Sequence, residues 1–245
     1  NKFNEITAET DGSLSKFANA HKYFGLQRTN RGGWIFREYA PNATSITLIG
    51  TFSNWQKKDM YMLHNIGNGV WEVKLPKSAL KHGDLYKMLV SWDGGQGERI
   101  PAYATRVVQD PQTYIFSAQV YAPETPYEFK IKRFRPNTNP LLIYECHIGM
   151  GQTFEGVGTY EEFREKILPR IAKNGYNAIQ IMAIQEHPYY GSFGYHVSNF
   201  FAASSRFGTP DDLKRLIDTA HEMGIAVIMD IVHSHAVKNE MEGLG

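Results

Sequence analysis

Hydrophobic and polar residues follow two different patterns along the chain. Between residues 21 and 121, short apolar runs alternate with turns rich in Gly, Asn, Asp and Pro, and no helical spacing links the runs. Brief runs of this kind are typical of β-strands, and they lie at 32–41, 45–50, 69–76, 85–92 and 106–110. Strands at such short intervals predict an antiparallel, immunoglobulin-like β-sandwich over residues 21–121.

After Pro140 the pattern becomes β-α-β-α-β. Apolar runs predict strands at 141–149, 177–184 and 225–232, and apolar residues at helical spacing predict helices at 159–175 and 209–224. Near-continuous apolar strands joined by helices are typical of parallel strands that are buried on both faces. We therefore expect a parallel α/β fold over residues 141–245.

The segment 209–224 is the best-defined helix. Thr209 is the predicted N-cap, Pro210 suits the first helical position, and Asp212 completes a capping box. Gly224 predicts the end of the helix. Two further segments lie outside the sandwich and the α/β fold. Residues 1–20 predict an N-terminal helical segment. Residues 122–140 contain four of the eleven prolines and predict a linker.

Composition narrows the class of protein. The chain has 26 basic and 25 acidic residues, which argues against a nucleic-acid partner. No stretch approaches 18 apolar residues, so we expect no membrane partner. The single cysteine, Cys146, excludes an intrachain disulfide and, without a signal peptide, predicts a cytoplasmic location. The missing initiator Met predicts a processed or partial chain.

Polar side chains gather where the three strands of the second half end. The first strand ends with Glu145 and His147, and the third ends with Asp230, His233 and His235. The second is followed by Glu186, His187, Tyr189, Tyr190, Tyr195 and His196. Because chemistry in parallel α/β folds collects beyond the carboxyl ends of the strands, these residues predict a functional face.

Two kinds of site suit this face. His233 and His235 are two positions apart, and neutral imidazoles at that spacing can share a zinc ion in a barrel hydrolase. A carboxylate, imidazoles and tyrosine rings also suit a sugar, because they bind hydroxyls and stack on a pyranose ring. Since Asp230 lies deeper in its strand, we favour the sugar site, with no metal and no cofactor; a metal-dependent hydrolase that uses His233 and His235 is the less favoured alternative.

The same residues resemble a known family. DIVHSH (230–235) resembles the first short signature of the α-amylase superfamily, in the variant typical of 1,4-α-glucan branching enzymes, and EHPYYGSFGYH (186–196) is similar to the same enzymes. REYAPNATSITLIGTFSNW (37–55) resembles the carbohydrate-binding sandwich that precedes their barrel. The resemblance covers essentially all 245 residues. It implies that residues 141–245 are the first units of a TIM-type (β/α)8 barrel, incomplete after its third strand.

The resemblance also implies roles for individual residues. His235 would hydrogen-bond the glucose at the cleavage point, Tyr195 would stack beneath it, and Asp230 would support the site. The substrate-binding residues expected in the barrel are Tyr195, His235, Asp230 and His187. In the sandwich, Trp55 and Lys87 match positions that contact glucan in related modules, and α-1,4-glucan such as glycogen or amylose is the expected partner.

No catalytic residue is expected within the chain. Enzymes of this superfamily use a nucleophilic Asp and an acid/base Glu, which the resemblance places beyond Gly245. We expect the parent enzyme to cleave α-1,4 bonds and form α-1,6 branches in glycogen or starch biosynthesis. This chain alone is expected to be inactive and to need the remainder of its own barrel. A non-catalytic α-glucan-binding protein, in which the sandwich binds the polymer, is the alternative.

Overall fold

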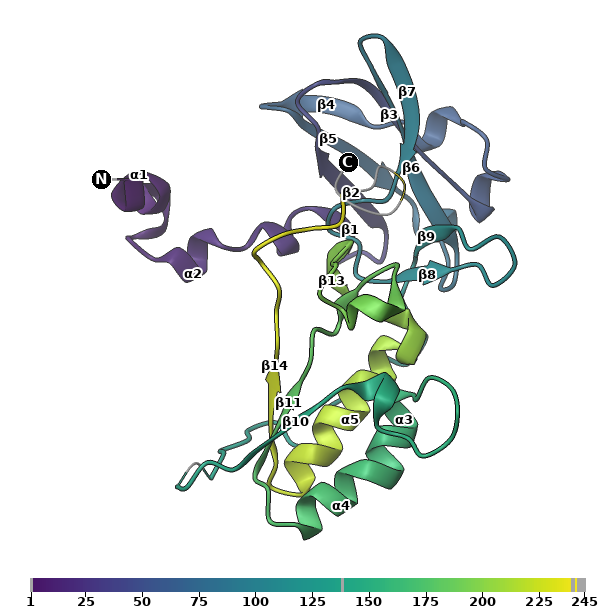
Figure 1. Ribbon diagram of the computed structural model, residues 1–245. Coiled ribbons are helices and arrows are strands. Elements are labelled where there is room, and N and C mark those ends of the chain that lie inside the picture. The colour runs from purple at the N-terminus through teal and green to yellow at the C-terminus, as the bar shows by residue number, and fades with distance from the viewer. Residues whose placement is uncertain (1, 138, 239–240, 242–245) are drawn as a thin grey trace. The chain divides into compact units, whose positions relative to one another are not determined.

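The chain forms two compact units in a computed structural model, which describes residues 2–137, 139–238 and 241 (Figure 1). Unit 1 consists of Asn1–Ala104 and Ser117–Tyr121. Unit 2 consists of Thr105–Phe116 and Ala122–Gly245. The short segment Thr105–Phe116 is therefore grouped with the second half of the chain, although it precedes the last residues of unit 1.

Unit 1 is an antiparallel β-sandwich, which confirms the predicted sandwich. One sheet has the order β1-β2-β5-β4, and in the other sheet β6 pairs with β3, β7 and β9. All five predicted strands are present: four are β2, β3, β5 and β6, and the fifth, predicted at 106–110, is β8 (Val107–Gln109). The strands of this unit are β1 (Gly25–Arg28), β2 (Trp34–Tyr39), β3 (Ala43–Gly50), β4 (His64–Gly67), β5 (Val70–Leu75), β6 (Leu85–Trp92), β7 (Gly95–Arg99) and β9 (Phe116–Gln119).

Alternate side chains of these strands fill the core of unit 1. Trp34 and Phe36 of β2 are buried, and Ile46 and Leu48 of β3 are inaccessible to solvent. Exposure alternates with a period of two in β2, whereas every residue of β3 from position 46 to position 50 is buried. By contrast, all residues of β4 are exposed, so this strand has no apolar alternation and the pattern does not predict it.

The first 20 residues contain two short helices. These are α1 (Lys2–Thr7) and α2 (Leu14–Phe17). The Oγ of Ser13 accepts a hydrogen bond of 3.3 Å from the backbone N–H of Lys16, which caps α2. Both helices are too short to be stable in isolation.

Unit 2 is built on a parallel three-stranded sheet with the order β10-β11-β14. Figure 1 shows α3, α4 and α5 together on one side of these strands. The predicted β-α-β-α-β order is confirmed, with a π-helical turn at Phe163–Ile167 between α3 and α4. The elements are β10 (Ile143–Cys146), α3 (Tyr160–Glu162), α4 (Leu168–Lys173), β11 (Ala178–Ile181), α5 (Pro210–Glu222) and β14 (Ala226–Met229).

The ends of α5 follow the sequence prediction. The Oγ1 of Thr209 accepts the N–H of Asp212 at 3.2 Å, and the Asp212 carboxylate accepts the N–H of Thr209 at 2.8 Å. This is the predicted capping box, with Pro210 at the first helical position. Gly224, at φ +77°, follows the last turn. The apolar face of α5 packs through Leu216 against the core of the sheet.

The prediction that the parallel strands are buried on both faces is wrong. Ile179 of β11 points into the core beneath the helices and is inaccessible, whereas Ile143 of β10 and Ile228 of β14 are 41% and 36% exposed. The register aligns Ile143 with Ala178, so Ile143 lies on the face opposite Ile179. The helices cover one face of the sheet, and the other face is exposed at Ile143 and Ile228, although Ala178 on the central strand is buried there.

The predicted linker contacts α5 through the carboxylate of Asp218, together with an ion pair between Lys130 and Glu222 and stacking of Phe134 on His221. Asp218, only 1% exposed, accepts hydrogen bonds from the Tyr127 hydroxyl at 2.7 Å and from the backbone N–H groups of Lys130 and Ile131 at 2.9 and 3.0 Å. Burial acts to raise the pKa of Asp218, but these hydrogen bonds lower it overall. The second part of the linker is therefore ordered along the helix.

Candidate functional site

Two of the predicted substrate residues meet beyond the end of β14. The Tyr195 hydroxyl donates a 2.8 Å hydrogen bond to Oδ2 of Asp230. This bond is the main reason that the pKa of Tyr195 is raised to about 12, with burial as the second cause. Tyr195 also packs on the buried cluster of Ala183, Val197 and Val232. Both side chains are half-buried, so they remain partly accessible to a ligand.

His235 completes this cluster. Its Nε2 lies 2.7 Å from the carbonyl oxygen of Tyr195, and its Nδ1 lies 2.8 Å from Oγ of Ser234. Because a carbonyl oxygen only accepts, Nε2 carries the hydrogen, and in the neutral ring Nδ1 accepts from the Ser234 hydroxyl. Tyr195, Asp230 and His235 thus come together although 40 residues separate Tyr195 from His235. We call them the Tyr195 cluster.

Backbone hydrogen bonds fix the polar end of β14. The N–H of Asp230 donates to the carbonyl of Ile181 at 3.0 Å, which continues the ladder with β11. The N–H of Val232 donates to Oε1 of the buried Gln185 at 3.1 Å. Gln185 begins the strand β12 (Gln185–Glu186), which pairs with β13 (Asn199–Ala203). Val232 is thereby held at the base of the segment that carries His235.

A glycine sets the position of Tyr195. Gly194 has φ +90°, and a Cβ atom there would overlap the carbonyl oxygen of Ala183. Phe193 before it is also left-handed, at φ 53°. The chain can therefore turn over the end of β11 only with glycine at position 194, and this turn directs Tyr195 toward Asp230.

His187 is not part of the Tyr195 cluster. Its ring is inaccessible to solvent, its Nδ1 is 2.9 Å from the carbonyl oxygen of Gln185, and burial lowers its pKa to about 4. His147, at the end of β10, is 8% exposed and meets the rings of Tyr190 and Phe207 edge-on. Both histidines are interior side chains in this structure.

The remaining candidates at the strand ends have structural surroundings. Glu186 is 1% exposed and accepts the N–H of Ser205 at 2.7 Å. Glu145 is exposed and 3.3 Å from Gln180 on the neighbouring strand. Burial, followed by the charge of Glu145, raises the pKa of the Cys146 thiol to about 12, which keeps it protonated. Cys146 is thus a buried apolar residue rather than a nucleophile.

The positions of His233 and His235 give little support to a metal site. His233 is exposed, and both ring nitrogens of His235 already lie within 2.8 Å of oxygen atoms. Over residues 2–137, 139–238 and 241, no group of three or more His, Cys, Asp or Glu side chains is arranged to hold a metal ion. None of the helices in the same residues is long and apolar enough to cross a membrane.

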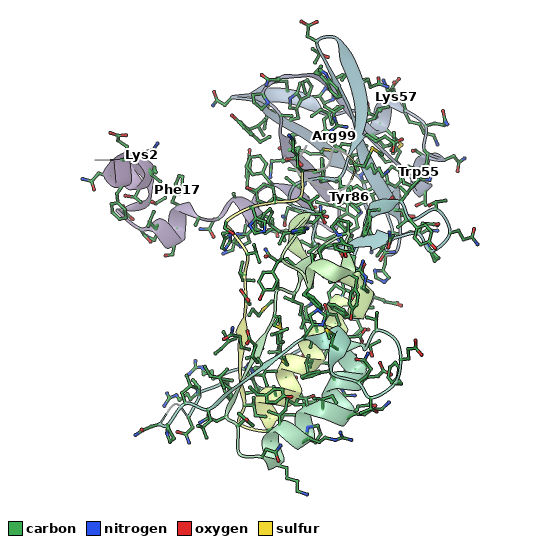
Figure 2. The ribbon with its side chains drawn as sticks, viewed as in Figure 1. Lys2, Phe17, Trp55, Lys57, Tyr86 and Arg99 are labelled. Carbon is green, nitrogen blue, oxygen red and sulfur yellow. The ribbon has the colours of Figure 1, made fainter. Side chains whose placement is uncertain are left out.

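In unit 1, Trp55 and Lys87 differ sharply in exposure. Trp55 is 37% exposed, and Figure 2 shows it, like Lys57, on the segment that follows β3. Its φ of 58° is unusual for a bulky residue, and its N–H donates to the carbonyl of Gly50 at 2.8 Å. Lys87 is 4% exposed and pairs with Glu98 at 3.0 Å.

The sequence pattern does not predict a polar contact between the segment after β3 and the strands β6 and β7. The Lys57 ammonium donates to Oε1 of Gln96 at 3.0 Å, and the Ser91 hydroxyl donates to the same atom at 3.2 Å. Ser91 and Gln96 are opposite each other in the β6–β7 register. The short turn Asp93–Gly94 between β6 and β7 is the one local signal for this pairing.

Comparison with known proteins identifies both units. The sequence model of the family described as carbohydrate-binding module 48 (isoamylase N-terminal domain) matches residues 23–111, and that of the alpha amylase catalytic domain matches residues 151–242. Among solved structures, a pullulanase from Bacillus acidopullulyticus is 18% identical, with a TM-score of 0.70, over 87% of this chain and 30% of that chain. The catalytic module of a glycogen-degrading pneumococcal virulence factor is 17% identical, with a TM-score of 0.71, over 89% and 38%. Such distant likeness shows the fold alone.

The fold and the two family matches place the chain in the α-amylase superfamily, as a carbohydrate-binding module followed by part of a catalytic barrel. Curated relatives are more specific. The 1,4-alpha-glucan-branching enzyme of Aspergillus oryzae is 47% identical over 243 residues, and the chloroplastic/amyloplastic 1,4-alpha-glucan-branching enzyme 2-2 of Arabidopsis thaliana is 46% identical over 240 residues. Within the superfamily, the chain belongs to the 1,4-α-glucan-branching enzyme family. Both matches include 96% of this chain, which spans 35% and 30% of the length of these relatives.

Proposed function

We propose that the chain is the part of a 1,4-α-glucan-branching enzyme that contains its glucan-binding module and the first sugar contacts of its barrel. The parent enzyme would cleave an α-1,4 bond and transfer the released glucan chain to a 6-hydroxyl. The observation that carries this proposal is the Tyr195 cluster, which combines a carboxylate, an imidazole and an aromatic ring at the carboxyl end of a barrel strand. These groups suit a glucose unit.

Each member of the Tyr195 cluster has a distinct role in the proposal. The Tyr195 ring would stack on the sugar, and Asp230 would hold the phenol in place through their hydrogen bond. His235 would turn its ring from the Tyr195 carbonyl to a sugar hydroxyl when substrate binds. The sugar contacts of His187 and Lys87 stay predictions, and both side chains would have to become accessible to make them.

The module would bind glucan through Trp55. A half-exposed indole held at a left-handed backbone position is costly and is typical of ligand-binding surfaces. Lys57 and Gln96 add hydrogen-bonding groups to the same unit. We further propose a reducing, cytoplasmic location, in keeping with a single buried cysteine.

Affinity electrophoresis tests the module. In a native gel that contains glycogen, the chain should be retarded, and Trp55→Ala should abolish the retardation. Tyr39→Ala is the matched control, because Tyr39 is an exposed aromatic residue of the same unit, and it should leave the retardation unchanged. Equal retardation of all three proteins would contradict the role of Trp55.

An iodine-stain assay tests the catalytic part of the proposal. The chain alone should leave amylose unbranched, whereas the longer reading frame should branch it, with a rate reduced about tenfold or more by Tyr195→Ala. Glycogen retardation combined with an inactive longer reading frame would favour the non-catalytic glucan-binding alternative. Stoichiometric zinc in the purified chain would favour the metal-dependent hydrolase.

A further inference from the structure

Unit 2 contains a pocket of about 270 Å³ that no member of the Tyr195 cluster lines. Its walls come from the segment Thr105–Phe116, which includes β8 (Val107–Gln109), from Glu186 of β12, and from the turn after β13. Pockets for drug-sized ligands have volumes of about 300–1,000 Å³, so this one suits a molecule of roughly one sugar ring.

A guanidinium that forms no ion pair lines this pocket. The Arg206 guanidinium donates to the carbonyl oxygens of His187 and Pro188 at 3.3 and 3.1 Å, which uses two of its five N–H donors. Arg164 and Arg215 of the same unit form ion pairs with Glu161. Within the described part of the chain, Arg206 forms no such pair. Carbonyl groups satisfy hydrogen bonds but do not neutralise the charge of a half-buried guanidinium. The charge of Arg206 acts on the Glu186 carboxylate, whose pKa it tends to lower, and the guanidinium lies 5.6 Å from the centre of the Tyr190 ring.

A second guanidinium lines the same pocket. Arg106 is 8% exposed and donates a 2.6 Å hydrogen bond to the carbonyl oxygen of Gly208, which fixes its direction. Arginines are groups that proteins use to bind phosphate, because each presents a planar set of donors, and two of them line this pocket. The charge of the pocket therefore favours an anion.

The remaining walls favour a ligand that also has hydroxyl groups. Glu186 lines the pocket, and its carboxylate accepts backbone N–H groups from Ser205 and His187 at 2.7 and 3.2 Å. A carboxylate accepts a hydroxyl hydrogen but repels a second anion. Pro111 and Phe116 provide apolar surface against which a sugar ring can lie.

We propose that this pocket binds a phosphorylated monosaccharide, with its phosphate at Arg106 and Arg206 and its hydroxyls toward Glu186. The site is separate from the proposed glucan contacts, so binding here requires neither Trp55 nor the Tyr195 cluster. Neutral glucan fragments lack the anion and are not ligands of this pocket.

Isothermal titration calorimetry on the full chain tests this proposal, with glucose 6-phosphate, inorganic phosphate and glucose as probes. Glucose 6-phosphate should bind, inorganic phosphate should bind more weakly, and glucose should not compete with either. Arg206→Gln and Arg106→Gln should each weaken glucose 6-phosphate binding about tenfold or more. Arg206→Lys, which keeps the charge but not the planar donors, should give an intermediate loss.

Arg170→Gln is the matched control, because Arg170 is exposed on α4 of the same unit, and it should bind like the unaltered chain. A second readout needs no variant: glucose 6-phosphate should shift the amide resonances of Ser205 and Gln109, which line the pocket. The proposal is overturned if glucose 6-phosphate does not bind, if Arg206→Gln and Arg170→Gln bind alike, or if those amides do not shift. Equal affinity for phosphate and glucose 6-phosphate would overturn the sugar part of the proposal.

Discussion

Tyr195 donates its phenolic hydrogen to Asp230, whose backbone N–H is bonded in turn to Ile181 of the neighbouring strand. The position of the aromatic ring is thus tied to the parallel sheet through one carboxylate. This relationship supports the proposal that Asp230 holds the phenol in place.

The first prediction concerns the ionisation of Tyr195. Its pKa of about 12 exceeds the value near 10 of an unfolded tyrosine, so its hydrogen bond stabilises the fold below about pH 10 and is lost as the pH rises through about 12. Asp230→Asn should lower this pKa toward 10. NMR titration of labelled tyrosines, with Tyr195→Phe for assignment, measures the change. Asp211→Asn should leave the Tyr195 titration unaltered; an equal change in both variants would contradict the assignment.

The second prediction concerns the carboxylate that holds the linker. Asp218→Asn puts an NH2 group where two backbone N–H groups and a phenol donate, so the free energy of unfolding should fall by about 2–4 kcal/mol. Because the pKa of Asp218 is lowered in the folded state, its contribution is present above the unfolded value near 3.9 and is lost as the pH falls below it.

Urea denaturation at neutral and acidic pH measures this loss. Asp211→Asn is the matched control on α5, because Asp211 makes only an ion pair with Lys214 on the same helix. That substitution should cost well under about 1 kcal/mol. Similar losses of unfolding free energy for the two variants would contradict the role of Asp218 in holding the linker.

The third prediction concerns Gly194. Gly194→Ala should lower the free energy of unfolding by at least about 2 kcal/mol, because the new methyl group overlaps the Ala183 carbonyl and the backbone is left-handed. Gly175→Ala separates the two causes: Gly175 has φ +84°, but no atom lies within 4 Å of the position that its added methyl carbon would take. It should cost only about 1–2 kcal/mol. Equal costs in chemical denaturation would refute the packing argument.

The fourth prediction concerns the open face of the parallel sheet. Ile143 and Ile228 are exposed on edge strands, and apolar edges of this kind pair with other chains. The purified chain should self-associate in a concentration-dependent manner, and Ile228→Lys should lower the average mass measured by static light scattering. Met60→Lys, an equally polar change at an exposed position of unit 1, should not. Association unaffected by Ile228→Lys would locate the contact elsewhere.

Local chemistry explains which parts of the fold could be predicted. The capping box at Thr209 and Asp212 depends on four consecutive residues, and the alternation in β2 depends on six, so both are readable from the chain. The exposed strand β4 has no such pattern and is defined by its pairing with β5. The open face of the sheet also lies outside any local rule, since it depends on what packs there.

The candidate site, too, could be predicted only where local sequence determines it. The ends of β10, β11 and β14 could be predicted to share one face, because parallel strands place their carboxyl ends together. The burial of Lys87 could not, since it depends on Glu98 in the next strand. His187 is similar: it follows Gln185 and Glu186 in the sequence, yet its ring is inaccessible to solvent and lies near Phe207, twenty positions away along the chain.

The division of the chain has a consequence for its covalent topology. The backbone passes between the two units three times, after Ala104, after Phe116 and after Tyr121. A single proteolytic cut at any one of these crossings gives two fragments with no covalent bond between them, but at least one unit is then built of segments from both fragments, and packing within that unit holds them together. Release of either unit requires all three to be severed, so limited proteolysis that nicks one crossing should yield fragments that still travel together under native conditions and separate only in denaturant.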